Sequence, residues 1–292
     1  AMADNTTLDI NGSATYAVSN LEANTDASGT SGATSLAYGD VTDNAATITT
    51  GSGATTVSGS TTGDTLTINA ASLAQNTTLT ESGAANQVVT ALVGDINASS
   101  LSGSLTVTTG NASDNGISIT TGTANTTINA SGSGDTVTVN ADAMADNTTL
   151  DINGSATYTV SNLEANTDAA GSSGAVSLAY GDITDNAATV TTGSGATTVS
   201  GSNSGDTITT NASSLPQNTL LTLFGAAKQV VTNLIGNISG SALTGTLDVT
   251  TADAADNGID ITSGSADTTI NASGTGDTIT VNADAMADNT TL

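Results

Sequence analysis

The sequence predicts an all-β fold in which the chain coils repeatedly into a β-solenoid rod. Three observations lead to this class. Long stretches of the chain repeat without gaps, short segments alternate apolar with polar residues, and in part of each repeat the apolar positions recur every nine residues. A string of small β-sandwich domains is the alternative fold for such a sequence.

The repeat comes first, because tandem repeats define the architecture of a chain. The segment Ala1–Leu8 returns unchanged at Ala143–Leu150 and at Ala285–Leu292, so 1–142 forms one repeat and 143–284 the next. Each repeat divides into two related halves of equal length, in the order ABAB. We expect the chain to be a segment of a longer array. The predicted modules are 1–71 (A1), 72–142 (B1), 143–213 (A2) and 214–284 (B2), and 285–292 begins the next module.

Short segments with strand character recur in each module. Residues 65–68 and 136–139 alternate Thr with an aliphatic residue, which is the period-two pattern of a half-buried strand. Clusters of Gly, Asn, Asp and Ser between such segments predict turns. In the second half of module A1, Ile48, Val57 and Leu66 lie nine residues apart, so one strand and one turn together take nine residues.

The core available to these strands favours the solenoid over the sandwich. The chain contains one Phe, four Tyr and no Trp, and module B1 has no aromatic residue. A sandwich as small as one module normally needs large side chains in its core, whereas stacked coils bury small aliphatic side chains against neighbouring coils. Three or four coils per module, at about 4.8 Å each, would make a module roughly 14–19 Å long.

The chain is strongly acidic. It has 27 acidic residues and one basic residue, Lys228, which gives a formal net charge of −26. This charge excludes nucleic acids and anionic membrane surfaces as partners and favours cations. The sequence has no cysteine, which fits an extracellular protein without disulfides. No apolar run reaches the roughly 20 residues of a membrane-spanning helix.

Residues suited to catalysis are scarce. The chain has no His or Cys, and its single basic residue is a Lys, so constellations built on His, Cys or Arg are excluded. Paired carboxylates can hydrolyse glycosides, but aromatic platforms for a sugar cleft are limited to the four tyrosines and Phe224. We therefore predict a protein that is not an enzyme.

Two kinds of segment resemble repeats of giant bacterial secreted surface proteins. Residues 132–137 (GSGDTV) and 274–279 (GTGDTI) resemble part of the RTX nonapeptide, the calcium-binding repeat of proteins exported by type I secretion. Residues 101–119 resemble the Thr/Ala/Gly-rich strand repeats of S-layer proteins and large adhesins. The resemblance implies an extracellular location at a bacterial cell surface.

Calcium is the cofactor that the resemblance and the negative charge together suggest. In RTX repeats, carboxylates of adjacent coils share one calcium ion. Here the Gly-Asp pair occurs at one equivalent position per module, so these carboxylates of successive modules would lie too far apart to share an ion. A site would instead combine nearby carboxylates, such as Asp40 with Asp43 or Asp182 with Asp185, with Asn and carbonyl oxygens. The alternative is that these residues cap turns. The predicted calcium ligands are Asp40, Asp43, Asp64, Asp114, Asp135, Asp182, Asp185, Asp206, Asp256 and Asp277.

One asparagine recurs at the same position of every module. It could form an internal stack or act as an ordinary turn residue, and we favour the turn. The four copies are Asn69, Asn140, Asn211 and Asn282.

These features together predict a structural role. We expect a repeat segment of an extracellular bacterial surface fibre, S-layer or biofilm matrix, forming a rigid rod that cations stabilise. The alternative is an adhesin tract or stalk that binds, or presents binders of, glycans or cells. We expect self-association through neighbouring repeats or other copies, and cell-surface or matrix glycans are the second class of partner.

Overall fold

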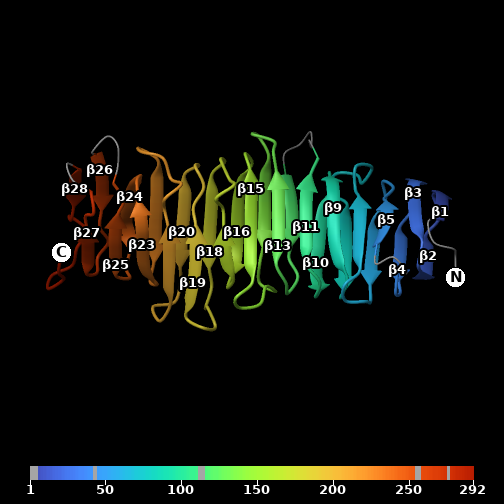
Figure 1. Cartoon of the computed structure of the whole chain (residues 1–292), viewed down its shortest axis with the longest axis horizontal. Helices are drawn as coiled ribbons and strands as arrows, with labels where there is room; N and C mark the ends of the chain where they lie inside the picture. Colours follow the sequence, from blue (N-terminus) through green and yellow to red (C-terminus); the bar gives the residue numbers. More distant parts are fainter. Residues whose placement is uncertain (1–5, 42–44, 111–115, 254–257, 275–276) are drawn as a thin grey trace. The chain divides into compact units, whose positions relative to one another are not determined.

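The computed structural model describes residues 6–41, 45–110, 116–253, 258–274 and 277–292. Over these residues the regular structure consists of β-strands alone (Figure 1). The chain divides into two compact units, Ala1–Ala145 and Asp146–Leu292. Each unit is a β-solenoid built from two parallel sheets.

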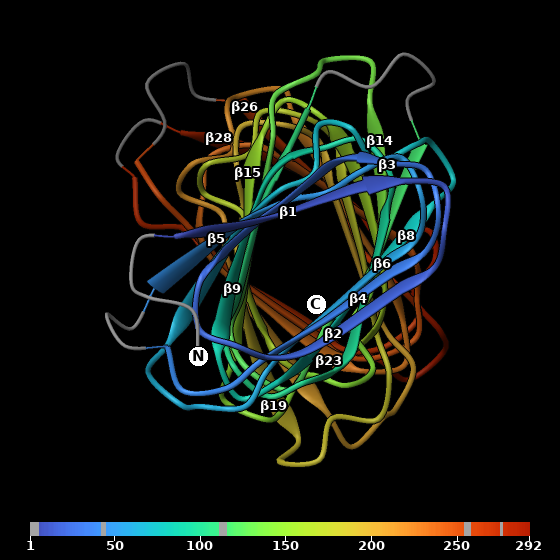
Figure 2. The same ribbon diagram turned by 90° about the vertical axis from the view of Figure 1, so that its right-hand side faces the viewer.

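In the N-terminal unit, the odd-numbered strands β1 to β13 form one parallel sheet and the even-numbered strands β2 to β14 form the other. Figure 2 shows the first strands of the two sheets, β1 and β2, on opposite sides of the interior. The strands are β1 Thr7–Gly12, β2 Tyr16–Leu21, β3 Asn24–Thr30, β4 Thr34–Tyr38, β5 Ala45–Thr49, β6 Thr55–Gly59, β7 Thr65–Asn69, β8 Thr78–Gly83, β9 Asn86–Leu92, β10 Asp95–Leu101, β11 Leu105–Thr109, β12 Gly116–Thr120, β13 Thr126–Ala130 and β14 Thr136–Asn140.

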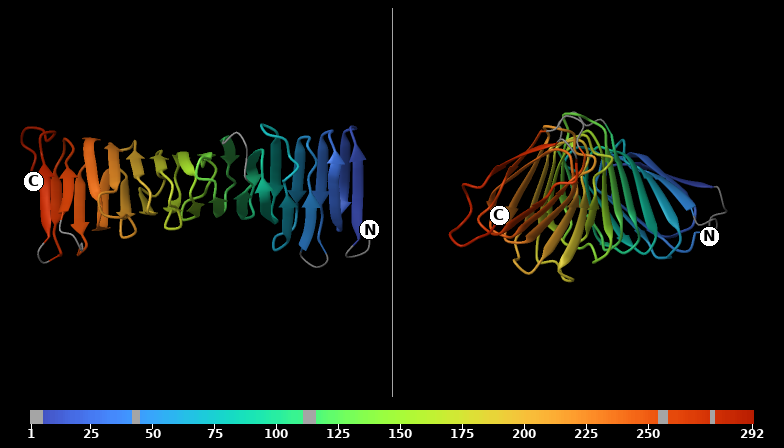
Figure 3. Two further views of the ribbon diagram at one scale, coloured as in Figure 1. Left: turned by 90° about the horizontal axis from the view of Figure 1, so that it is seen from above. Right: turned by 60° about the vertical axis from the view of Figure 1, so that its left-hand side comes forward.

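The C-terminal unit repeats this arrangement, with its odd-numbered strands in one sheet and its even-numbered strands in the other. Figure 3 shows the strands of each unit following one another in chain order. The strands are β15 Thr149–Gly154, β16 Thr157–Leu163, β17 Asn166–Asp168, β18 Val176–Tyr180, β19 Ala187–Thr191, β20 Thr197–Gly201, β21 Thr207–Asn211, β22 Leu220–Gly225, β23 Lys228–Leu234, β24 Asn237–Leu243, β25 Leu247–Thr251, β26 Gly258–Thr262, β27 Thr268–Asn271 and β28 Thr278–Asn282.

One coil of the solenoid consists of two strands and two corners. The chain runs along one sheet, turns, and returns along the other, so each strand pairs in parallel with the second strand after it. Strands β5, β6 and β7 carry Ile48, Val57 and Leu66. The predicted nine-residue step is therefore one strand and one corner, and each step crosses to the opposite sheet.

The core consists of columns of small aliphatic side chains between the two sheets. One column in the N-terminal unit is formed by residues in register on five neighbouring strands, each at most 1% exposed: Ile48, Ile68, Val89, Val107 and Ile128. Burying such a side chain contributes about 1.5–3 kcal/mol. The apolar side chains of each coil pack against those of the coil before it, which explains how a chain with few aromatic residues forms a core.

Each module contributes seven strands, which make three and a half coils. Module A1 contains β1 to β7 and module B1 contains β8 to β14. Because seven is odd, equivalent strands of the two modules lie in opposite sheets: Leu66 belongs to the odd-numbered sheet and its counterpart Val137 to the even-numbered sheet. One A and one B module together make seven complete coils, so the ABAB order matches the structural period. At about 4.8 Å per coil, a module spans about 17 Å.

Two positions at or near strand ends require unusual backbone conformations. Gly83 has φ 96°, and a Cβ there would lie 2.2 Å from the carbonyl oxygen of Gly59 on the preceding coil, so no larger residue fits. A second position is left-handed in every module. It is occupied by Asn20, Asn162 and Asn233, each with φ 55°, but by Ala91, with φ 53°, in module B1. Asn tolerates this conformation better than Ala does.

Candidate functional site

The aspartates of the Gly-Asp pairs lie in corners between strands, and most of their side chains are buried. In the N-terminal unit, Asp64 is 2% exposed and its Oδ2 accepts a hydrogen bond from the backbone N–H of Val41 at 3.0 Å. In the C-terminal unit, Asp206 is 1% exposed and its Oδ2 accepts from the N–H of Ile183 at 3.1 Å. The carboxylate thus joins its corner to the corner of the preceding coil. Asp135 is buried as well, and Asp277 is half-buried.

The other predicted ligands in the described residues are exposed. Asp40 and Asp182 lie in corresponding corners of the two units, and Asp182 accepts a hydrogen bond from the side-chain amide of Asn203 on the next coil. Asp185 accepts from the N–H of Ala187 at 3.3 Å, which makes it a turn cap. The predicted ligands Asp43, Asp114 and Asp256 lie outside the described residues.

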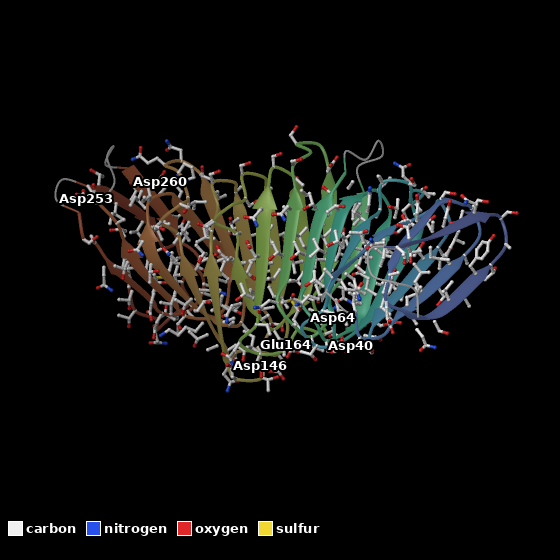
Figure 4. All side chains as sticks on the ribbon, turned by 45° about the vertical axis from the view of Figure 1, so that its right-hand side comes forward. Asp40, Asp64, Asp146, Glu164, Asp253 and Asp260 are labelled. Carbon is white, nitrogen blue, oxygen red and sulfur yellow. The ribbon has the colours of Figure 1, made fainter. Side chains whose placement is uncertain are left out.

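The topology brings some of these carboxylates together and separates others. Asp40 and Asp64 follow even-numbered strands, β4 and β6, so they lie on successive coils at the same edge of the N-terminal unit (Figure 4). Asp135 follows an odd-numbered strand, β13, and lies at the opposite edge. In the C-terminal unit, Asp182 and Asp206 are placed as Asp40 and Asp64 are.

A metal centre would need several such ligands in one place. Among the residues that the structure describes, no group of three or more Asp, Glu, His or Cys side chains has the arrangement of a metal site. Calcium binding by the sequence-predicted residues stays a prediction.

The recurring asparagine caps a turn. In each module its side-chain oxygen accepts a hydrogen bond from the N–H two residues later, at 3.1 to 3.3 Å. This geometry agrees with the turn interpretation and not with an internal stack. The four residues are Asn69, Asn140, Asn211 and Asn282.

A second set of side chains links coils, and sequence reasoning did not find it. In module A1, Oδ1 of Asn24 accepts from the N–H of Thr47, 23 residues later, at 2.8 Å. In module B1 the carboxylate of Asp95 takes the same role toward Ser118, also at 2.8 Å. The partners are far apart in sequence, so only the coil register brings them together. The equivalent acceptors in the C-terminal unit are Asn166 and Asn237.

The A modules contain a polar pair inside the core. The hydroxyl groups of Tyr38 and Thr25 lie 2.7 Å apart and both side chains are buried. Burial raises the pKa of Tyr38 to about 12, and the hydrogen bond to Thr25 opposes that effect. Module B1 has Thr109 and Ile96 at these two positions. Module B1 thus has a smaller polar residue in place of the tyrosine and an apolar residue in place of its threonine partner. Tyr180 and Thr167 form the same pair in module A2, 3.0 Å apart.

A carboxylate and an amide occupy core positions of module B1. Glu81 and Gln87 are both fully buried, and burial raises the pKa of Glu81 to about 8. The sequence contains a signal for the burial of Glu81, because Glu81 lies two residues after the apolar Leu79 and aligns with apolar residues in the other modules. Those residues are Ile10, Ile152 and Leu223.

On the outer faces of the sheets, some aspartates of neighbouring strands lie side by side. Asp151 of β15 lies in register with Asp168 of β17, and Asp9 of β1 lies in register with Asp26 of β3. Partial burial raises the pKa of Asp151, a hydrogen bond from Asn153 lowers it, and the charge of Asp168 raises it further. These neighbouring carboxylates repel each other.

The single lysine is paired with an acid that its own module supplies. Nζ of Lys228 on β23 lies 2.6 Å from Oδ2 of Asp248 on β25, and both side chains are partly exposed. The equivalent positions of module B1 hold Asn86 and Thr106, so the two charges occur together. An exposed pair of this kind contributes about 0–1 kcal/mol.

Comparisons with known proteins assign no relative. No family model matches the chain, and no curated protein or solved structure matches it significantly. Within the described ranges, the structure has no helix with the length and apolar character needed to cross a membrane.

Proposed function

We propose that this chain is a non-enzymatic structural segment of an extracellular bacterial surface fibre, S-layer or biofilm matrix. Its role would be that of a rigid, cation-stabilised rod. The observation that carries the proposal is the uninterrupted parallel pairing within each unit, where every internal strand is hydrogen-bonded on both sides. Stability then grows with the number of coils, which suits a structural element.

Side-chain hydrogen bonds between coils support this role. Asp64, Asn24 and Asp95 each bind a backbone N–H of another coil. Such contacts resist sliding of one coil over the next, because a slip of one residue would break them and turn the apolar columns outward. A segment specialised for rigidity would be expected to repeat such contacts. The contact of Asn24 recurs in all four modules, and the contact of Asp64 recurs in module A2.

Electron microscopy tests the rod. Negatively stained samples of the chain should show straight particles of uniform width, and flexible threads would refute the proposal. Val89→Pro should bend or shorten the particles, because it removes an N–H from a strand paired on both sides. Val88→Thr is the matched control. Val88 is only half-buried and its neighbours in register, Thr67 and Thr106, are already threonine.

Calcium titration tests cation stabilisation. The melting temperature should rise with millimolar Ca²⁺ well beyond the effect of NaCl at equal ionic strength. Replacing Asp182 and Asp185 by Asn should reduce the calcium response, whereas Asp260→Asn, on the outer face of β26, should leave it intact. Equal responses to the two salts would reduce the effect to charge screening.

One observation favours a second function, that of an adhesin tract. Strand β22 exposes two large apolar side chains, Leu220 at 41% and Phe224 at 39%. An exposed aromatic ring on a hydroxyl-rich sheet suits contact with a sugar ring. Glycan arrays probed with the chain and with Phe224→Ser, which installs the residue of module B1, would test it. Binding that disappears in the variant supports the adhesin, and an array without binding contradicts it.

A further inference from the structure

A carboxylate without a partner lies in the core of the N-terminal unit. Glu81 on β8 is fully buried, and neither carboxylate oxygen has a hydrogen-bond partner. It faces the interior together with Leu79, two residues earlier on the same strand. Val57 lies in register with it on β6. An ionised carboxylate in such apolar surroundings is strongly disfavoured.

The side chain that faces this region from the next strand is an amide. Gln87 on β9 is fully buried, and its Nε2 donates to the carbonyl oxygen of Ser82 at 3.2 Å. Ser82 adjoins Glu81, so the amide lies against the end of β8. Oε1 of Gln87 has no partner. In module A2 the same carbonyl position, that of Asn153, accepts from the hydroxyl of Tyr158 at 2.6 Å.

No basic group balances Glu81. In the described residues, strands β6, β7, β9 and β11 carry no titratable side chain. Two acids on adjoining elements are engaged in other hydrogen bonds. Asp95 of β10 accepts from the N–H of Ser118, and Asp64, in the corner before β7, accepts from the N–H of Val41. The environment of Glu81 therefore accommodates a neutral acid and not a carboxylate.

We propose that Glu81 and Gln87 form a proton-dependent latch in the core of module B1. The O–H of the neutral Glu81 donates a hydrogen bond to Oε1 of Gln87, and ionisation of the acid opens the coil formed by β8 and β9. Module B2 has the same Gln at position 229 but Leu223 in place of the acid. The latch is therefore confined to the N-terminal unit, and it does not depend on the function proposed above.

The direction of the pH effect follows from the two states of the acid. Burial raises the pKa of Glu81 from 4.5 to about 8 in the folded chain. Below pH 4.5 the acid is neutral whether the coil is closed or open, so opening does not respond to pH. Between pH 4.5 and about 8 the open form releases a proton, so the equilibrium constant for opening rises about tenfold per pH unit.

Hydrogen exchange measured by mass spectrometry tests the latch within one molecule. Exchange of the full chain is followed at pH 6 and pH 7.5, with correction for the intrinsic rates. Peptides from residues 78–92 should lose protection by more than tenfold over this interval. Peptides from residues 220–234, the equivalent segment with Leu223, should keep theirs and serve as the internal control.

Two variants separate ionisation from general loosening. Glu81→Leu installs the residue of module B2 and should abolish the pH response of residues 78–92. Glu81→Gln stays polar but cannot ionise in this range, so it should abolish the response too. An equal pH response in both segments, or a response that persists in Glu81→Leu, would overturn the proposal.

Discussion

Replacing Glu81 by leucine should remove a pH-dependent loss of stability from the whole chain. In the folded chain the acid has a pKa of about 8, against an ordinary value of 4.5 once the chain unfolds. Each pH unit between these values corresponds to about 1.36 kcal/mol, so the unfolding free energy of the wild type should fall by about 5 kcal/mol between pH 4.5 and pH 8. Above pH 8 the acid is ionised in both states and the loss levels off.

The assay is urea unfolding followed by far-ultraviolet circular dichroism at pH 5, 6, 7 and 8. The difference between wild type and Glu81→Leu cancels the contributions of the other acids and should widen steadily with pH. The reciprocal change, Leu223→Glu, should create the same pH dependence in the C-terminal unit, where Gln229 is already present. Parallel curves for wild type and Glu81→Leu would refute the reasoning.

Three further predictions concern stability at neutral pH. Tyr38→Phe leaves the buried hydroxyl of Thr25 without its partner and should cost about 1–3 kcal/mol; adding Thr25→Val should restore most of it, as a double-mutant cycle in urea would show. Ala91→Asn places a residue that tolerates the left-handed conformation at this position and should stabilise the chain by about 1 kcal/mol. An unchanged unfolding free energy would refute the idea that Ala91 is strained. Asp151→Thr removes the repulsion from Asp168 and should stabilise the chain by about 0.2–1 kcal/mol in low salt. The melting temperature should therefore rise in low salt but not at 1 M NaCl, where the repulsion is screened.

The fold could be predicted because its signals are local. Alternation in residues 65–68 marks a strand, and the spacing of Ile48, Val57 and Leu66 marks the step between strands; both are confirmed. The division of a module into three and a half coils was not predicted. It depends on which strands pair, and the irregular half of each module, with strands such as β9 and β10, hides the strand count.

The candidate site was less predictable, for a physical reason. The sequence suggests that Asp64 lies in a turn, but its burial depends on Val41, a residue of another coil. Cross-coil partners such as Asn24 and Thr47 are 23 residues apart and follow no local pattern. The burial of Glu81 is easier to predict, because Glu81 lies two residues after Leu79 on the same strand and therefore on the same, apolar face.

The odd number of strands in a module limits how such a gene can change length. Gain or loss of a single module would carry every later module onto the other sheet, exchanging the residues that face the two sides. Recombination in steps of one complete A and B pair leaves both sides as they were. Length variation among alleles of this array should therefore occur in whole pairs of modules.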